Sequence, residues 1–297
     1  MKRISLISLI TSMTVFGTIG IFRNYIPLPS AFLAMARGFI GAAFIFLFLI
    51  ITKKGVNLAA IKKNLAVLLL TGAFIGINWI LLFESYKYTT VAVATLCYYM
   101  APVFVTLLSG VFFKESLTAK KLICISAATL GMVLVSGVLS TDSIDASQII
   151  GILLGLGAAV FYSSVTLVSK KVKDISSFDM TLVQLFAAAV VVMPYSLIFE
   201  DTSLKGASAG ALWLVLLVGI LHTGIAYVLY FTSVKNLEAG KVALFSYLDP
   251  IIAIILSVII LKEEMTLLTA IGAVLILLST LVSEIKFSRF SKKEKIK

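Results

Sequence analysis

The sequence predicts an all-α membrane protein of ten transmembrane helices, arranged as two inverted five-helix repeats. Three observations predict this fold. The chain is 60% hydrophobic and only 13% charged, with a mean hydropathy of +1.11, whereas a soluble chain of 297 residues needs more polar surface to cover its core. Apolar runs of about 20 residues, long enough to cross a bilayer as helices, recur through the sequence. The second half also repeats the pattern of the first.

Charged residues and Gly/Pro breaks divide the apolar runs into spans, none of which shows the alternation of a membrane β-strand. The first run follows a charged head resembling a signal peptide, but it lacks a small-residue cleavage site, so we expect it to be retained. The connections are short and leave no room for a soluble domain. The ten predicted spans are 4–22, 30–52, 65–83, 90–113, 121–139, 149–169, 178–199, 211–234, 241–261 and 266–285.

The positive charges predict the orientation. With the N-terminus in the cytoplasm, 20 of the 25 Lys and Arg residues fall in cytoplasmic segments, including the basic tail 287–297. Cytoplasmic loops carry such an excess, so we expect both termini inside a multi-pass protein of the cell (inner or plasma) membrane. The same bias accounts for the net charge of +11 without nucleic acid as a partner; the expected partner surface is the lipid bilayer.

An internal repeat divides the chain. Residues 76–118 match residues 224–266 at a shift of 148 without a gap, and "VFGT" at 15–18 weakly matches "VFYS" at 160–163. The matches include rare residue types, which an apolar composition does not produce by chance. The polar and proline pairs are Tyr99 with Tyr247, Pro102 with Pro250, Ser109 with Ser257, Lys114 with Lys262, Glu115 with Glu263, and Thr118 with Thr266.

The repeat predicts two domains, 1–140 and 148–286, each with five spans. Five is odd, so the second copy must cross the membrane in the opposite sense. Inverted repeats are typical of alternating-access carriers, whose solute site lies near the midplane between the halves. A gene duplication without a role in transport is the alternative.

The ends of the fourth and ninth spans, "YYMAP…KES" and "YLDP…KEE", together with five plus five spans, resemble the drug/metabolite transporter superfamily in its EamA-like branch. The resemblance covers essentially the whole chain. It implies a secondary carrier with a central cavity between the repeats, often an exporter of amino acids or related metabolites. One position departs from the repeat, because Asp249 matches Ala101, and this departure singles out Asp249.

Asp249 shares one narrow face of the ninth span with Ser246, Pro250, Ala253 and Ser257. A charged Asp at mid-bilayer costs about 2.5–3.5 kcal/mol on insertion scales, so it needs a partner, water or cargo. We expect it to bind a polar end of the cargo or a coupling proton, and the alternative is a structural hydrogen bond or ion pair. Proline removes a helical hydrogen bond, so Pro250 and its repeat mate Pro102 are the predicted hinge.

Other polar and aromatic residues of the spans complete the predicted site. Arg37, the one Arg deep in a span, suits a cargo carboxylate, but neutralising Asp249 or anchoring its helix is equally open. His222 is the sole histidine, with proton work and plain packing as alternatives. Trp79, Tyr98, Tyr162 and Tyr230 add aromatic surface. The predicted substrate-binding residues are Arg37, Asn78, Tyr99, His222, Tyr227, Ser246, Tyr247 and Asp249.

No enzyme, nucleotide-binding or metal-binding motif appears in the sequence, so no cofactor, metal or catalytic residue is predicted. Uphill transport then requires an ion gradient or exchange. The prediction is a secondary active exporter of a small organic metabolite such as an amino acid or related compound. An intramembrane enzyme acting on a lipid-linked substrate and a non-transporting scaffold are the alternatives. Cargo, coupling and oligomeric state are not specified by the sequence.

Overall fold

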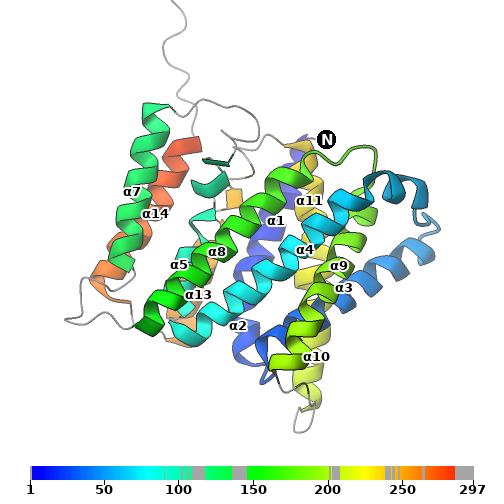
Figure 1. The fold of residues 1–297 in the computed structure, drawn as a ribbon, viewed down its shortest axis with the longest axis horizontal. Coiled ribbons are helices and arrows are strands. Elements are labelled where there is room, and N and C mark those ends of the chain that lie inside the picture. The colour runs from blue at the N-terminus through cyan, green and yellow to red at the C-terminus, as the bar shows by residue number, and fades with distance from the viewer. Residues whose placement is uncertain are drawn as a thin grey trace, which may run out of the picture.

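The computed structural model is a bundle of long helices (Figure 1). It describes residues 2–89, 91–101, 103–105, 107–108, 118–135, 146–200, 202, 208–237, 242, 245–246, 248–262 and 265–284, and all of its regular elements there are helical. In the first half these are α1 (Lys2–Gly17), α2 (Ile19–Asn24), α3 (Ser30–Ile51), α4 (Leu58–Tyr88), α5 (Val91–Tyr98) and α7 (Ala119–Val135).

The second half repeats this series. Its elements are α8 (Ala146–Ser169), α9 (Ser177–Phe199), α10 (Ala209–Leu217), the π-helix η1 (Val218–Ile225), α11 (Ala226–Asn236), α13 (Leu248–Leu256), the π-helix η2 (Ser257–Leu261) and α14 (Leu267–Glu284). Within the described part of the chain, six helices are long and apolar enough to cross a membrane. Four shorter apolar helices, Val93–Val105, Leu122–Gly131, Ile251–Ile260 and Ala270–Ser279, fall at the other four predicted spans. The predicted fold class is confirmed.

Two helices differ in detail from the predicted spans. The third span is longer than 65–83, because Asn57 caps α4 through a hydrogen bond from Ala60 N and the helix continues to Tyr88. The eighth span is not a plain α-helix but α10, η1 and α11 in series, and Thr223 Oγ1 donates to Val218 O, five residues back, in its π-helical part. Such wide turns within α-helices frequently occur at functional sites.

Matching hydrogen bonds show that the two halves pack in the same way. Ser85 Oγ of α4 donates to Gly151 O of α8 over 2.8 Å. Its repeat mate at a shift of 148, Ser233 of α11, donates to Ser5 O of α1 over the same distance. Each hydroxyl joins the third helix of one half to the first helix of the other, so a single packing arrangement is used twice.

Repeat-equivalent residues also meet each other where the halves touch. Trp79 Nε1 donates to Tyr227 Oη over 3.1 Å, and these residues are 148 apart. The rings of Phe39 and Phe186 lie edge to face at 5.9 Å, in helices α3 and α9 that each begin at a serine. A residue meets its own repeat mate only near a pseudo-two-fold axis, so this axis passes between these two pairs.

The repeats are inverted. Helix α4 runs parallel to α9, α9 runs antiparallel to α3, and α3 runs parallel to η1, so α4 and its repeat mate η1–α11 point in opposite directions. For α4 and α9 the contacts are Gly72 with Gln184 and Gly76 with Ala188. For α3 and α9 they are Gly38 with Ala189 and Phe48 with Phe178. For α3 and η1 they are Ile40 with Gly219 and Phe44 with Gly224.

The two ends of the bundle differ in charge. The lysine-rich end carries Lys53, Lys54, Lys62, Lys63, Lys171, Lys173 and Lys235. There Lys63 pairs with exposed Asp174 at 2.8 Å, and its ammonium lowers the pKa of that carboxyl. At the opposite end Glu200 accepts hydrogen bonds from Ala31 N and Phe32 N and so caps α3.

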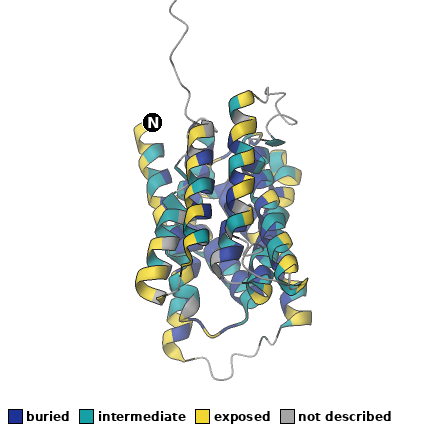
Figure 2. Cartoon of the chain, turned by 90° about the vertical axis from the view of Figure 1, so that its left-hand side faces the viewer, coloured by how far each residue is buried: buried dark blue, intermediate teal, exposed yellow. Residues whose placement is uncertain are grey.

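The outer surface of the bundle is apolar. Large hydrophobic side chains such as Ile123, Phe199, Trp213 and Leu267 are at least two-thirds exposed, and exposed residues cover the outward faces of the helices in Figure 2. Inside, small residues bring helices close, as where Gly131 of α7 lies against Gly272 O of α14. These two helices lie side by side at one edge of the bundle (Figure 1).

We predict that Gly72→Ala destabilises the protein by about 1–3 kcal/mol, because a Cβ there would lie 2.6 Å from Ala187 Cβ and 2.7 Å from Gln184 O. Gly210→Ala is the matched control, since its Cβ would meet only Ser208 Oγ at 3.7 Å. Thermal unfolding in detergent measures both. Equal melting temperatures for the two variants would contradict the close packing of α4 on α9.

Candidate functional site

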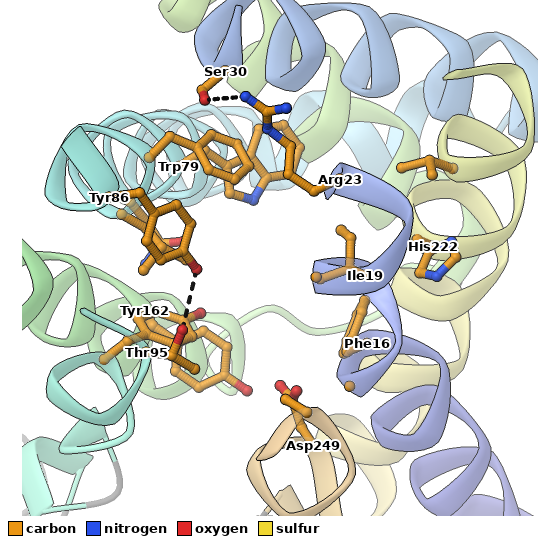
Figure 3. Close-up of a pocket in the computed structure, with 18 of the residues that line it drawn as sticks. Phe16, Ile19, Arg23, Ser30, Trp79, Tyr86, Thr95, Tyr162, His222 and Asp249 are labelled. Carbon is orange, nitrogen blue, oxygen red and sulfur yellow. Dashed lines mark hydrogen bonds between the residues drawn. The ribbon is translucent and has the colours of Figure 1, made fainter. Parts of the chain in front are cut away.

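One cavity of about 470 Å³ lies inside the bundle. Its walls come from α1, α2, α3, α4, α5, α8, η1, α11 and α13, so both repeats contribute. The surface is mainly aromatic and aliphatic, and a few polar side chains converge on it, which is the usual composition of a small-molecule site. Figure 3 shows the space between Tyr86 and Tyr162 on one side and Phe16 and Ile19 on the other, with Asp249 at its base.

Asp249 lies in the first turn of α13, and its carboxylate points into the cavity (Figure 3). Tyr99 Oη donates a hydrogen bond of 3.0 Å to Asp249 Oδ1. Among the described residues, no Lys or Arg nitrogen forms an ion pair with this carboxylate. The backbone of Asp249 is held by α1, where a Cβ on Gly17 would come within 2.7 Å of Asp249 O.

Arg37 projects from α3 and is only 5% exposed. Its guanidinium lies over the ring of Trp79, 4.2 Å from the centroid, and 5.3 Å from that of Phe83. Nε has no hydrogen-bond partner. Arg37 and Asp249 therefore line the same cavity without pairing with each other, and the cation is held by a ring that Tyr227 orients through its hydrogen bond to Trp79.

His222 lies in η1 and is 1% exposed. Its Nε2 is 2.9 Å from Thr18 Oγ1, and that hydroxyl donates to Val15 O. Nδ1 has no partner, and the ring packs edge to face on Phe22 at 4.8 Å. His222 thus joins η1 to the first span beside the cavity.

The predicted site residues largely come together. Six of them, Arg37, Asn78, Tyr99, His222, Tyr227 and Asp249, line the cavity. Asn78 also donates to Ala158 O of α8 at 2.6 Å, which fixes its amide. Ser246 is absent from the lining, and its hydroxyl donates to Val242 O. Tyr247 and Pro102 lie outside the described residues, and for Pro250 only the backbone, within α13, is described.

The polar and aromatic lining residues that the sequence analysis did not predict include Phe16, Arg23, Tyr86 and Thr95. The predicted first span, 4–22, leaves Arg23 in an outer loop, whereas in the structure it lies in α2 and donates to Ile26 O and Ser30 Oγ. Tyr86 was placed beyond the end of the third span. The longer α4 brings Tyr86 to the cavity, where its Oη lies 3.4 Å from Thr95 Oγ1. A capping signal at Asn57 could have indicated the earlier start of α4, but not its continuation past residue 83 to Tyr86.

The cavity reaches only one end of the bundle. Its lining includes Arg23, Pro27, Ser30 and Met265 but no residue of the lysine-rich end as the structure describes it. Toward that end, the hydroxyls of Thr166 and Tyr230 are 2.9 Å apart, joining α8 to α11. Among the described residues, the cavity is thus open on one side and closed by packed helices on the other.

Comparisons with known proteins agree with this architecture. The model of the EamA-like transporter family matches residues 3–137 and 149–284. Two similar proteins of Bacillus subtilis (strain 168) are uncharacterized transporters: YxxF is 28% identical over 93% of this chain and 88% of its own, and YoaV is 26% identical over 88% and 89%. A solved structure titled "Crystal structure of protein" has a TM-score of 0.73 at 19% identity, covering 94% of this chain and 96% of that one, and so shares the fold.

We expect Arg37→Met to leave the melting temperature unchanged or to raise it. The buried guanidinium has no carboxylate partner in the described structure, and replacing a buried charge by an apolar side chain of similar volume is often neutral or stabilising. Thermal unfolding in detergent without added solute provides the measurement. A loss of several degrees would instead identify Arg37 as an anchor of its helix.

Proposed function

The chain belongs to the EamA-like transporter family, and from this premise we propose that it is a secondary active transporter that exports a small zwitterionic metabolite, such as an amino acid or a related compound, by alternating access. The observation that carries the proposal is the pair of opposite charges, Arg37 and Asp249, which line one cavity without an ion-pair partner among the residues that the structure describes.

The two charges explain why the cargo would be a zwitterion. Isolated charges inside an apolar bundle are costly. A cargo carboxylate on the Arg37 guanidinium and a cargo ammonium on the Asp249 carboxylate would compensate both. Tyr99 orients the carboxylate through its hydrogen bond, and Trp79 holds the guanidinium by stacking. The site is therefore preorganised for a solute with both charges.

The remaining surface suits an apolar body between the charged ends. Rings of Phe16, Tyr86, Tyr162 and Tyr227 and aliphatic side chains cover most of the lining. The volume of about 470 Å³ lies within the range of small-molecule sites, roughly 300–1,000 Å³. Aromatic and aliphatic amino acids are accordingly the first cargo candidates.

Alternating access follows from the inverted packing. Because the halves use the same contacts in opposite directions, a second packing with the open and closed ends exchanged has a similar energy. Pro102 and Pro250 are the proposed hinges. The sequence shows no ATP-binding motif, so we propose that an ion gradient or exchange drives transport, with Asp249 as the carrier of a coupling proton.

The lysine-rich end is the proposed cytoplasmic end, because Lys and Arg accumulate on the cytoplasmic side of membrane proteins. Both termini are then cytoplasmic, the membrane is the cell membrane, and the cavity is open to the outside.

In proteoliposomes, Arg37→Met and Asp249→Asn should each abolish the uptake or efflux of labelled amino acids, because each removes one of the two charges that hold the cargo. Asp249→Asn should also abolish amino-acid-stimulated proton movement, measured with a pH-sensitive dye inside the vesicles. We expect at least a tenfold loss of flux for either variant, equivalent to about 1.4 kcal/mol of lost interaction.

Ser246→Ala is the control, because Ser246 is three residues from Asp249 in the chain but its side chain does not line the cavity. It should transport like the unchanged protein. Unaltered flux in both charge variants would exclude the zwitterion model. In a thermal-shift screen of the unchanged protein, stabilisation by lipid-linked compounds alone would favour the intramembrane enzyme instead.

The orientation makes a separate prediction. In a background with Cys97→Ala and Cys124→Ala, a membrane-impermeant maleimide applied to whole cells should label Lys262→Cys and not Lys54→Cys, since these exposed residues lie at opposite ends of the bundle. Permeabilised cells should label both. Labelling of Lys54→Cys alone in whole cells would reverse the orientation.

A further inference from the structure

A buried polar cluster lies outside the cavity, between α4, α8 and α9. Gln184 Nε2 donates to Thr71 Oγ1 over 2.7 Å and to Ser169 Oγ over 3.2 Å, and all three residues are 0% exposed. Gln184 Oε1 has no hydrogen-bond partner. None of the three lines the open cavity. An amide with an unsatisfied oxygen is a costly way to fill a helix interface, so the cluster calls for an explanation beyond packing.

Repeat symmetry relates this cluster to the cavity. Helices α3 and α9 begin at Ser30 and Ser177, and the same shift of 147 pairs Phe39 with Phe186, whose rings touch. At this shift the mate of Arg37 is Gln184. Each lies seven residues, or about 10 Å, from the start of its helix. Because the two helices are antiparallel, Arg37 is in the half toward the open end and Gln184 is in the half toward the lysine-rich end.

The residues that join helices on the closed side of the cavity have repeat mates on its open side. Thr166 and Tyr230 hold α8 against α11 through their hydroxyls. The shift of 145 that matches 15–18 with 160–163 pairs Thr166 with Ile21, and the shift of 148 pairs Tyr230 with Leu82. Both Ile21 and Leu82 line the open cavity. The residues that join the helices on one side thus correspond to residues that line the cavity on the other.

We propose that Gln184, Thr71 and Ser169 form the polar wall of a second cavity, which opens toward the lysine-rich end when the present cavity closes. This inference rests on the proposed alternating access. In that state Gln184 takes the place that Arg37 has now, and its amide contacts the polar ends of the solute. Nε2 donates to a carboxylate and Oε1 accepts from an ammonium. The unsatisfied Oε1 is the acceptor held ready for that contact.

The test measures solvent access in the full-length protein. In the Cys97→Ala, Cys124→Ala background, Gln184→Cys and Ser169→Cys are exposed to a membrane-impermeant maleimide from each side of the membrane separately. Ala189→Cys is the matched control, because Ala189 is equally buried but faces Gly38 in the crossing of α9 with α3. Ile21→Cys marks the present cavity.

Both cluster variants should label from the lysine-rich side about tenfold faster than Ala189→Cys, since even a minor population of the second state exposes them. Ile21→Cys should label from the opposite side. Ser169→Cys replaces only one oxygen with sulfur, so it still tests the inference if Gln184→Cys folds poorly. Labelling of Ile21→Cys while Ser169→Cys stays as unreactive as Ala189→Cys would overturn the inference. The assay needs no cargo, so a failure of amino acid transport is distinguished from a failure of this cavity.

Discussion

The hydrogen bond between Trp79 and Tyr227 joins the two repeats at equivalent positions, and the rest of the bundle is arranged around it. It lies by the pseudo-two-fold axis, with the Phe39–Phe186 contact at another point along that axis. The same indole forms the platform on which the Arg37 guanidinium lies. Trp79 therefore takes part both in the contact between the halves and in the geometry of the proposed solute site.

The scaffold is symmetric, whereas the chemistry is not. Hydrogen bonds such as Ser85 to Gly151 and Ser233 to Ser5 recur in both halves, because each satisfies the same helix packing. The two charges that face the cavity break the repeat: Asp249 matches Ala101, and Arg37 matches Gln184. The proposed exchange of open and closed ends requires that the repeated contacts be alike, and the proposed recognition of a solute with unlike ends requires residues that differ.

Particular residues show which features could be predicted from the sequence and which could not. The match of residues 76–118 with 224–266 predicted the inverted halves, and apolar length predicted the spans, because lipid forces each crossing segment to satisfy its own backbone as a helix. The acid at Asp249 and the cation at Arg37 stood out for their cost in an apolar environment. Tyr86 and Arg23 did not, because residues near the end of a span look like ordinary boundary residues until helix length and tilt are known.

The helical class, the number of spans, the repeat and the short list of polar residues could all be predicted in advance, because they follow from local hydropathy and from residue identity. Three features required the folded structure: Arg37 stacks on Trp79 instead of pairing with Asp249, Ser246 turns to its own helix, and the cavity, as far as the described residues line it, opens at one end. Those outcomes depend on how helices rotate and tilt against one another. Rotation is set by close contacts such as Gly72 with Ala187 and Gly17 with Asp249, which join residues far apart in the chain.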